Sequence, residues 1–226
     1  MIIRKIIHKG FTLVEMAIVL VIIGLLIAAF LTPLSAQLDL RNNTNTRNSL
    51  NDIRDALIGY ALIHNGNIDG KPYFPCPDTD APGTAGFGKE NRVGNLCVNV
   101  VGTLPFSDLG LVSTDSWNRQ FTYRVSQAFA NSDNGFSIGT LGDITVLDAV
   151  GGHTIATNIP ALVFSLGKNG AISPVVGANQ TENTNGDSIF VDKDFNESTT
   201  NPFDDLVVWI SPNVLMNRMV TAGRLP

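Results

Sequence analysis

The stretch KGFTLVEMAIVLVIIGLL, residues 9–26, places a single acid in an otherwise apolar run. The run from residue 11 to residue 31 has the length that a helix needs to cross a bilayer, about 20 residues. A charged side chain inside a membrane helix costs about 2.5–3.5 kcal/mol on insertion scales, so such residues are normally paired and functional. The acid, Glu15, therefore raises the question of which cation neutralises it.

Basic residues precede the apolar run. Residues 1–10 contain Arg4, Lys5 and Lys9 and no acid, and a cationic flank of this kind stays in the cytoplasm while the rest of the chain emerges on the far side. The alternative is a cleaved secretory signal peptide. That alternative fits less well, because the apolar stretch exceeds a usual signal core and the bulky Leu34 stands where a small residue is needed before a cut.

A cut between Gly10 and Phe11 creates a cation for Glu15. The new α-amino group stands four residues before the acid, which is about one helical turn. In a packed bundle, the amine of one copy can meet Glu15 of another copy and fix their axial stagger. The sequence therefore predicts that replacing Glu15 by Ala or Gln disrupts assembly.

Residues 10–15, Gly-Phe-Thr-Leu-Val-Glu, follow a short basic leader and precede a long apolar helix. This arrangement resembles the cleavage and methylation signature of type IV prepilins and of type II secretion pseudopilins. The resemblance implies that a prepilin peptidase in the membrane cuts after Gly10 and methylates the amine of Phe11. It also implies that an inner-membrane assembly platform moves subunits from membrane lipid into a helical filament of pilins or pseudopilins, with Glu15 assisting entry.

Four regions are expected along the chain. They are a leader (1–10), a transmembrane and filament-core helix (11–32), an amphipathic helix continuation (33–65) and a globular extracytoplasmic head (66–226). Pro33 predicts a kink or local melting of the helix. Residues 41–49, RNNTNTRNS, are poor helix formers and predict either a linker or a weak continuing helix.

The head is expected to be α+β and pilin-like, with the long N-terminal helix packed on an antiparallel β-sheet. Apolar residues at three- and four-residue spacing predict a helix that ends near Asn65-Gly66; they are Leu50, Ile53, Leu57, Tyr60, Ala61 and, at the margin, His64. Short alternating segments predict strands at 121–126, 144–147, 161–166 and 205–210. Residues 66–120 are dense in Pro and Gly and predict a long loop region, and 212–223 predict a short helix.

Two cysteines, Cys76 and Cys97, stand in the predicted loop region. An even pair in an exported chain usually forms a disulfide, and closing this loop stabilises the fold by about 3 kcal/mol in the chain-entropy model. The alternative is two buried free thiols. A metal pair fits less well, because neither cysteine has a second Cys or His at ligand spacing.

Three segments resemble the loop and last strand of major pseudopilins, which close on a calcium ion; they are 164–170, 185–187 and 203–209. The resemblance implies a Ca²⁺ site with oxygen ligands from Asp187, Asp204 and Asp205. The spacing departs from that family, because the interval between Gly170 and Asp204 is far longer than its compact loop. The alternative is that these acids cap turns or are solvated. A second acidic cluster comprises Asp192, Asp194 and Glu197.

Composition and motifs exclude some functional classes. Outside residues 1–10, 12 Lys and Arg face 20 Asp and Glu, and an acidic body of this kind predicts no nucleic-acid binding. The three histidines, His8, His64 and His153, stand in no nucleophile, metal or phosphate-loop motif. The sequence therefore predicts a protein that is not an enzyme, in which Trp117 and Trp209 serve as packing residues.

These inferences predict a structural subunit, a minor pilin or pseudopilin, because the head is larger than the compact head of a major pseudopilin. It is expected first as a single-pass inner-membrane protein with a cytoplasmic N-terminus and a periplasmic head, and then in a pilus or pseudopilus. One alternative is an adhesive minor pilin whose loops 66–100 and 177–202 recognise a surface, a secreted substrate or DNA. Another is an anchored extracytoplasmic enzyme with a look-alike leader.

Overall fold

The structure is a computed structural model that describes residues 10–170 and 175–226, with the backbone alone at 29–34. The chain divides into two compact units, 1–42 and 43–226. Helix α1, Leu13–Ile63, contributes residues to both units. Apart from Gly10, the predicted leader lies outside the described residues. The predicted domain boundaries after residues 32 and 65 stay predictions.

Helix α1 continues through both segments where the sequence predicts weakness. It includes Pro33, so the predicted local melting is wrong, while the predicted kink stays a prediction. It also includes residues 41–49, so the linker alternative is wrong and the continuing helix is correct. In that segment Thr46 is fully buried, and its hydroxyl accepts a hydrogen bond from the Ser116 backbone N–H at 3.2 Å. Tertiary contact of this kind offsets poor helix propensity.

The second half of α1 buries the predicted apolar stripe. Leu50, Ile53, Leu57 and Ala61 are each at most 1% exposed, and their spacing places them on one face of the helix. They pack into one core with residues of the sheet described next and of the C-terminal helix.

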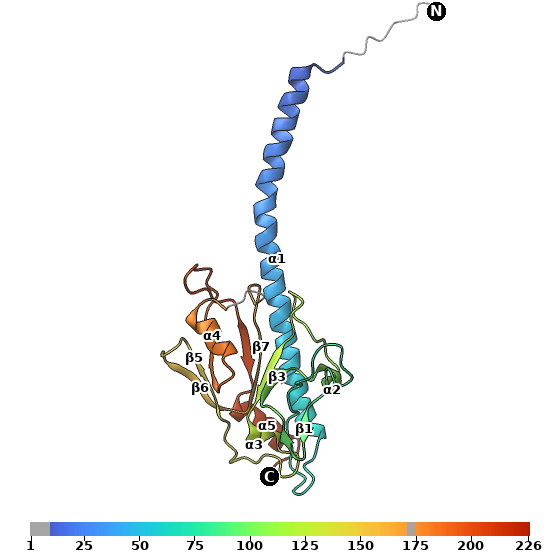
Figure 1. Ribbon diagram of the computed structural model, residues 1–226, viewed down its shortest axis with the longest axis vertical. Helices are drawn as coiled ribbons and strands as arrows, with labels where there is room; N and C mark the ends of the chain where they lie inside the picture. The colour runs from blue at the N-terminus through green and yellow to red at the C-terminus, as the bar shows by residue number, and fades with distance from the viewer. Residues whose placement is uncertain (1–9, 171–174) are drawn as a thin grey trace, which may run out of the picture. The chain divides into compact units, whose positions relative to one another are not determined.

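A four-stranded antiparallel sheet lies against this helix. Its strand order is β3-β4-β7-β9, with β3 at Val101–Thr103, β4 at Thr122–Val125, β7 at Ala161–Ser165 and β9 at Leu206–Trp209. Figure 1 shows the second half of α1 beside β3 and β7, with β5 and β6 on the other side of β7. The strands predicted around β4, β7 and β9 are therefore correct to within a residue at each end.

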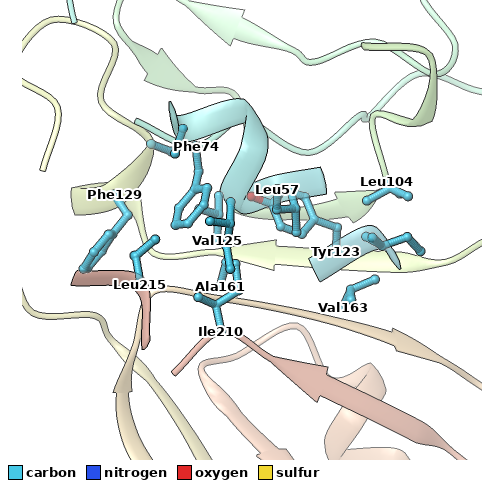
Figure 2. Packing of buried hydrophobic residues seen from close by; sticks show 14 of the residues in the cluster. Leu57, Phe74, Leu104, Tyr123, Val125, Phe129, Ala161, Val163, Ile210 and Leu215 are labelled. Carbon is cyan, nitrogen blue, oxygen red and sulfur yellow. The ribbon is translucent and has the colours of Figure 1, made fainter. Parts of the chain in front are cut away.

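Strand β7 is buried on both faces, and alternate residues enter different cores. Ala161 and Val163 belong to the core shared with α1, whereas Leu162 and Phe164 belong to a second core. Figure 2 shows the first core, to which Ala161 and Val163 of β7 and Leu57 of α1 contribute side chains. Because side chains alternate across a strand, the four-stranded sheet is the middle layer between the helix and a second sheet.

The second sheet has three strands in the order β6-β5-β8. They are β5 at Ile144–Leu147, β6 at Thr154–Ile159 and β8 at Ile189–Val191. The β5–β8 pair is parallel, which departs from the predicted antiparallel pairing. Parallel strands need a long crossover, and this one contains β6, β7 and helix α4, Ala178–Thr184.

Short elements punctuate the predicted loop region 66–120. They are the hairpin of β1, Arg92–Val93, and β2, Leu96–Cys97, then β3, and helix α2, Phe106–Leu109. Gly94 forms the hairpin turn at φ +62°, a conformation that favours glycine. None of these elements exceeds four residues, in keeping with the Pro and Gly density of the segment.

Two further helices complete the unit. Helix α3, Gln127–Ala130, buries Phe129. Helix α5, Pro212–Thr221, has Pro at its start and is followed by Gly223 at φ +68°, so it ends two residues before the predicted limit. Its Leu215 and Met219 are fully buried in the α1 core.

Candidate functional site

Helix α1 begins directly after the predicted cleavage point. Gly10, Phe11 and Thr12 are not helical, and Leu13 is the first helical residue. The side chain of Phe11 is 81% exposed within the chain. The Gly10–Phe11 bond therefore lies in accessible, non-helical backbone, which a peptidase can bind without first unwinding the helix.

Thr12 and Glu15 cap this end of the helix reciprocally. The backbone N–H and the hydroxyl of Thr12 both donate to Oε2 of Glu15 at 2.8 Å, and the Glu15 N–H donates to Thr12 Oγ1 at 3.2 Å. This is a capping box, in which two side chains satisfy backbone N–H groups that have no partner inside the helix. From the sequence, Glu15 is assigned only an amine partner, and its role in capping the helix is not predicted. The Thr-Leu-Val-Glu spacing is that of a capping box and indicates this role.

Cleavage after Gly10 would add a positive charge at this end of the helix, where Glu15 lies. A cut after Gly10 places a positive amine directly before Thr12, at the positive end of the helix dipole, where a cation is unfavourable and a carboxylate is favourable. Glu15 lies in the first turn of α1 and offsets that charge. Its carboxylate has several acceptor positions, so it can bind an amine while it still caps the helix.

The acids predicted as calcium ligands have separate local roles. Asp187 closes an exposed turn, where its carboxylate accepts from the Ile189 N–H at 2.7 Å and from Asn185 Nδ2 at 3.1 Å. Within residues 10–170 and 175–226, no three Asp, Glu, His or Cys side chains form a group that can hold a metal ion. The position of Asp187 matches the alternative of a turn-capping acid.

Asp204 and Asp205 are buried beside helix α4. Asp204 accepts from Gln180 Nε2 at 2.6 Å, and Asp205 accepts from Asn183 Nδ2 at 2.8 Å. Asn183 has a fixed orientation, because its Oδ1 accepts from the Val191 backbone N–H at 2.7 Å. Calcium binds oxygen atoms rather than N–H donors. These surroundings do not fit a calcium ion, and a change of Tm with calcium is the test of the predicted site.

Burial raises the pKa values of both carboxyls. It raises the pKa of Asp205 to about 7, an effect opposed by the hydrogen bond from Asn183 and increased by the charge of Asp204. Burial also raises the pKa of Asp204. In the part of the chain that the structure describes, Oδ1 of Asp205 is buried without a hydrogen-bond partner. A protonated, neutral carboxyl tolerates this environment best.

The second predicted acidic cluster is divided between a groove and the surface. Asp192 and Asp194 line a groove of about 710 Å³ together with Arg47 and Lys193, whereas Glu197 is exposed and is not among the lining residues. Burial raises the pKa of Asp192, and the positive charge of Arg47 opposes that shift. Because acidic and basic side chains both line this groove, its charges do not indicate which kind of ligand it binds.

The remaining residues singled out in the sequence have structural roles. Cys76 and Cys97 form a disulfide with their Cα atoms 5.2 Å apart. Trp117 packs against the core that contains α1, and Trp209 packs against the second core. His153 is exposed and lies 3.4 Å from Asp148.

The fold and its N-terminus define a class: an α+β protein, consistent with a pilin-like fold, whose long N-terminal helix starts at an accessible, capped end. Within that class, residues 7–31 match the family model for the prokaryotic N-terminal methylation motif, which is the signature of type IV pilins and pseudopilins. The motif supports a pilin-like or pseudopilin-like structural protein that begins anchored in a membrane.

Other comparisons add no relatives. Neither the curated proteins nor the solved structures contain a match to this chain. Among the described residues, no helix combines the length and the apolar character needed to cross a membrane.

Proposed function

We propose that this chain is a minor structural subunit of a type IV pilus or of a type II secretion pseudopilus. The observation that carries the proposal is the methylation motif at 7–31, which coincides with an accessible Gly10–Phe11 bond directly before a capped helix. The precursor spans the inner membrane once, with its N-terminus in the cytoplasm and its head in the periplasm. Prepilin peptidase cuts after Gly10 and methylates Phe11.

Assembly then brings the mature N-termini of neighbouring subunits together. Glu15 of an incoming subunit binds the amine of Phe11 in a subunit already in the filament, and this pairing removes an uncompensated charge from the apolar core. The inner-membrane assembly platform and the other pilins or pseudopilins are the partners in this step. The head contributes surface to the filament and no catalysis.

Co-expression with a prepilin peptidase tests the proposal. The wild-type chain is expected to yield a product that begins at Phe11 and carries one methyl group, as measured by mass spectrometry of the N-terminal peptide. Gly10→Leu is expected to block the cut. Gly24→Ala is the matched control, because an added Cβ meets nothing within 4 Å at either glycine. Cleavage of the Gly10→Leu chain after residue 10, or a wild-type cut elsewhere, contradicts the proposal.

A ligand-binding minor pilin is the second candidate function. The observation that favours it is an open groove of about 470 Å³ in the head, formed in part by the disulfide-closed loop region around Glu90. Binding of a ligand to the purified chain, independent of filament formation, tests this candidate.

A further inference from the structure

The groove in the head combines aromatic rings with hydrogen-bonding groups. Its lining residues are Tyr60, His64, Tyr73, Lys89, Glu90 and Asp108. Tyr60 lies in the last turns of α1, His64 directly follows that helix, and the others come from residues 73–108; none of them lines the groove that contains Asp192 and Asp194. Sites for small molecules typically join aromatic surface to a few polar groups that fix the orientation of the ligand.

Three rings form one wall of the groove. Tyr60 and His64 stack, with ring centroids 3.6 Å apart and planes 11° apart. The centroid of Tyr73 lies 6.0 Å from each of them, and its plane is 78° from Tyr60 and 67° from His64. Equal distances place Tyr73 beside the stack rather than on its axis. Tyr73 therefore does not stack on the outer face of the His64 ring.

The hydrogen bond of His64 fixes which of its ring nitrogens is free to accept. Nδ1 lies 2.8 Å from the carbonyl oxygen of Tyr60. Because a carbonyl oxygen only accepts, Nδ1 carries the proton, and Nε2 of the neutral ring is then an acceptor. The half-buried ring thus offers an apolar face and an acceptor at its edge.

The charges around the groove balance. Glu90 forms an ion pair with Arg92 at 2.9 Å, and the carboxylate of Glu90 also accepts a hydrogen bond from the hydroxyl of Tyr60 at 3.3 Å. Asp108 uses Oδ2 to accept the Glu90 N–H at 2.7 Å, and Lys89 is exposed at the rim. Arg92 does not line the groove but neutralises Glu90 from behind it, and Lys89 offsets the charge of Asp108. This balance gives no net attraction to a charged ligand, but hydroxyl groups can donate to the acids and accept from Lys89.

We propose that this groove binds a neutral sugar ring of hexose size, with one face of the sugar on His64 and its hydroxyl groups on Asp108 and Lys89. The stacked rings provide the apolar contact for the C–H face of the sugar. The sugar is either free or one unit of a glycan. This inference deepens the second candidate function, and it does not depend on whether the chain enters a filament.

Proton NMR of the histidine rings tests this site directly. The chain has only three histidines, so the His64→Ala and His153→Ala variants assign their signals. The full chain, held in a detergent without a sugar head group, is titrated with methyl glucoside, methyl galactoside, methyl mannoside and N-acetylglucosamine. The His64 signals are expected to shift and to saturate at millimolar concentrations of at least one sugar, while the His153 signals stay unchanged.

Variants separate binding from folding. Binding to the variants is followed through the broadening of the sugar's own proton signals, since His64→Ala has no His64 ring. His64→Ala is expected to weaken binding by about tenfold, because it removes the aromatic face. Lys89→Met keeps the exposed stem but removes the donors, so it is expected to weaken binding without affecting the fold. His153→Ala is the matched control and is expected to bind as the wild type does.

Three results overturn the inference: no neutral sugar shifts the His64 signals, glucuronate or glucosamine binds more tightly than each of the four neutral sugars, or the His64→Ala and Lys89→Met variants both bind as the wild type does. A glycan array probed with the full chain then distinguishes a free sugar from a unit of a larger glycan. None of these outcomes bears on cleavage at Gly10, so failure of this inference leaves the filament proposal intact.

Discussion

Replacement of Asp205 by Asn is expected to remove most of the pH dependence of the head's stability. The residue Asp205 is 4% exposed, and its Oδ1 lacks a hydrogen-bond partner among the described residues. Burial raises its pKa from 3.8 to about 7. The folded state therefore holds a proton that the unfolded state has already released above pH about 4.

The sign and size of the effect follow from this difference. The stabilisation by the protonated carboxyl is complete below pH about 4, the unfolded-state value, and is lost as the pH rises through about 7. Each unit of pKa difference corresponds to about 1.4 kcal/mol, so the loss is about 4 kcal/mol. Burial also raises the pKa values of Asp204 and Asp192, so their contributions have the same sign.

Chemical denaturation of the full chain at a series of pH values from about 4 to about 8 measures this loss. Above pH about 7, Asp205→Asn is expected to be more stable than the wild type, because a neutral amide keeps an acceptor for Asn183. Asp187→Asn, which removes an exposed carboxylate, is the matched control. Equal pH dependence in the wild type and in Asp205→Asn refutes the reasoning.

Three further predictions concern the head. Reduction of the Cys76–Cys97 disulfide, or its replacement by two serines, is expected to lower the free energy of unfolding by about 3 kcal/mol, and denaturant midpoints with and without reductant measure this; equal midpoints contradict it. Leu57→Ala removes most of a fully buried side chain and leaves a cavity, so it is expected to lower the free energy of unfolding by about 2–5 kcal/mol. Ile63→Ala, at an exposed position, is the control. Equal losses of unfolding free energy in the two variants contradict this prediction. Addition of calcium or of a chelator is expected to leave Tm unchanged, because the buried acids accept from amide groups, and a clear calcium-dependent rise in Tm contradicts that reading.

Sequence patterns predict those helices and strands whose buried residues form a regular pattern within the segment itself. The stripe from Leu50 to Ala61 is a clear helical pattern, the segment around β4 alternates apolar and polar residues, and β9 is apolar. In contrast, β6 at Thr154–Ile159 is an edge strand whose residues are mostly exposed, so it shows no alternation. The parallel position of β8 depends on a long crossover, which local patterns do not encode.

The candidate site residues likewise comprise some that the sequence identifies and some that only tertiary packing reveals. The processing motif is local, so Gly10, Phe11 and Glu15 can be identified from adjacent residues, and Thr12 could have been identified from its spacing to Glu15. The buried acids cannot be interpreted from composition, because Asp204 and Asp205 resemble metal ligands until α4 brings Gln180 against Asp204 and Asn183 against Asp205. The groove beside α1 likewise combines His64 with residues 73–108 through tertiary packing.

The most direct measurement of the central claim is the mass of the N-terminal peptide of this chain in filaments sheared from cells that express it with its own secretion or pilus machinery. We expect a chain that begins at N-methylated Phe11, and we expect Glu15→Gln to be cleaved normally but to be absent from the filaments. A filament-bound chain with its leader intact, or normal incorporation of Glu15→Gln, contradicts the account.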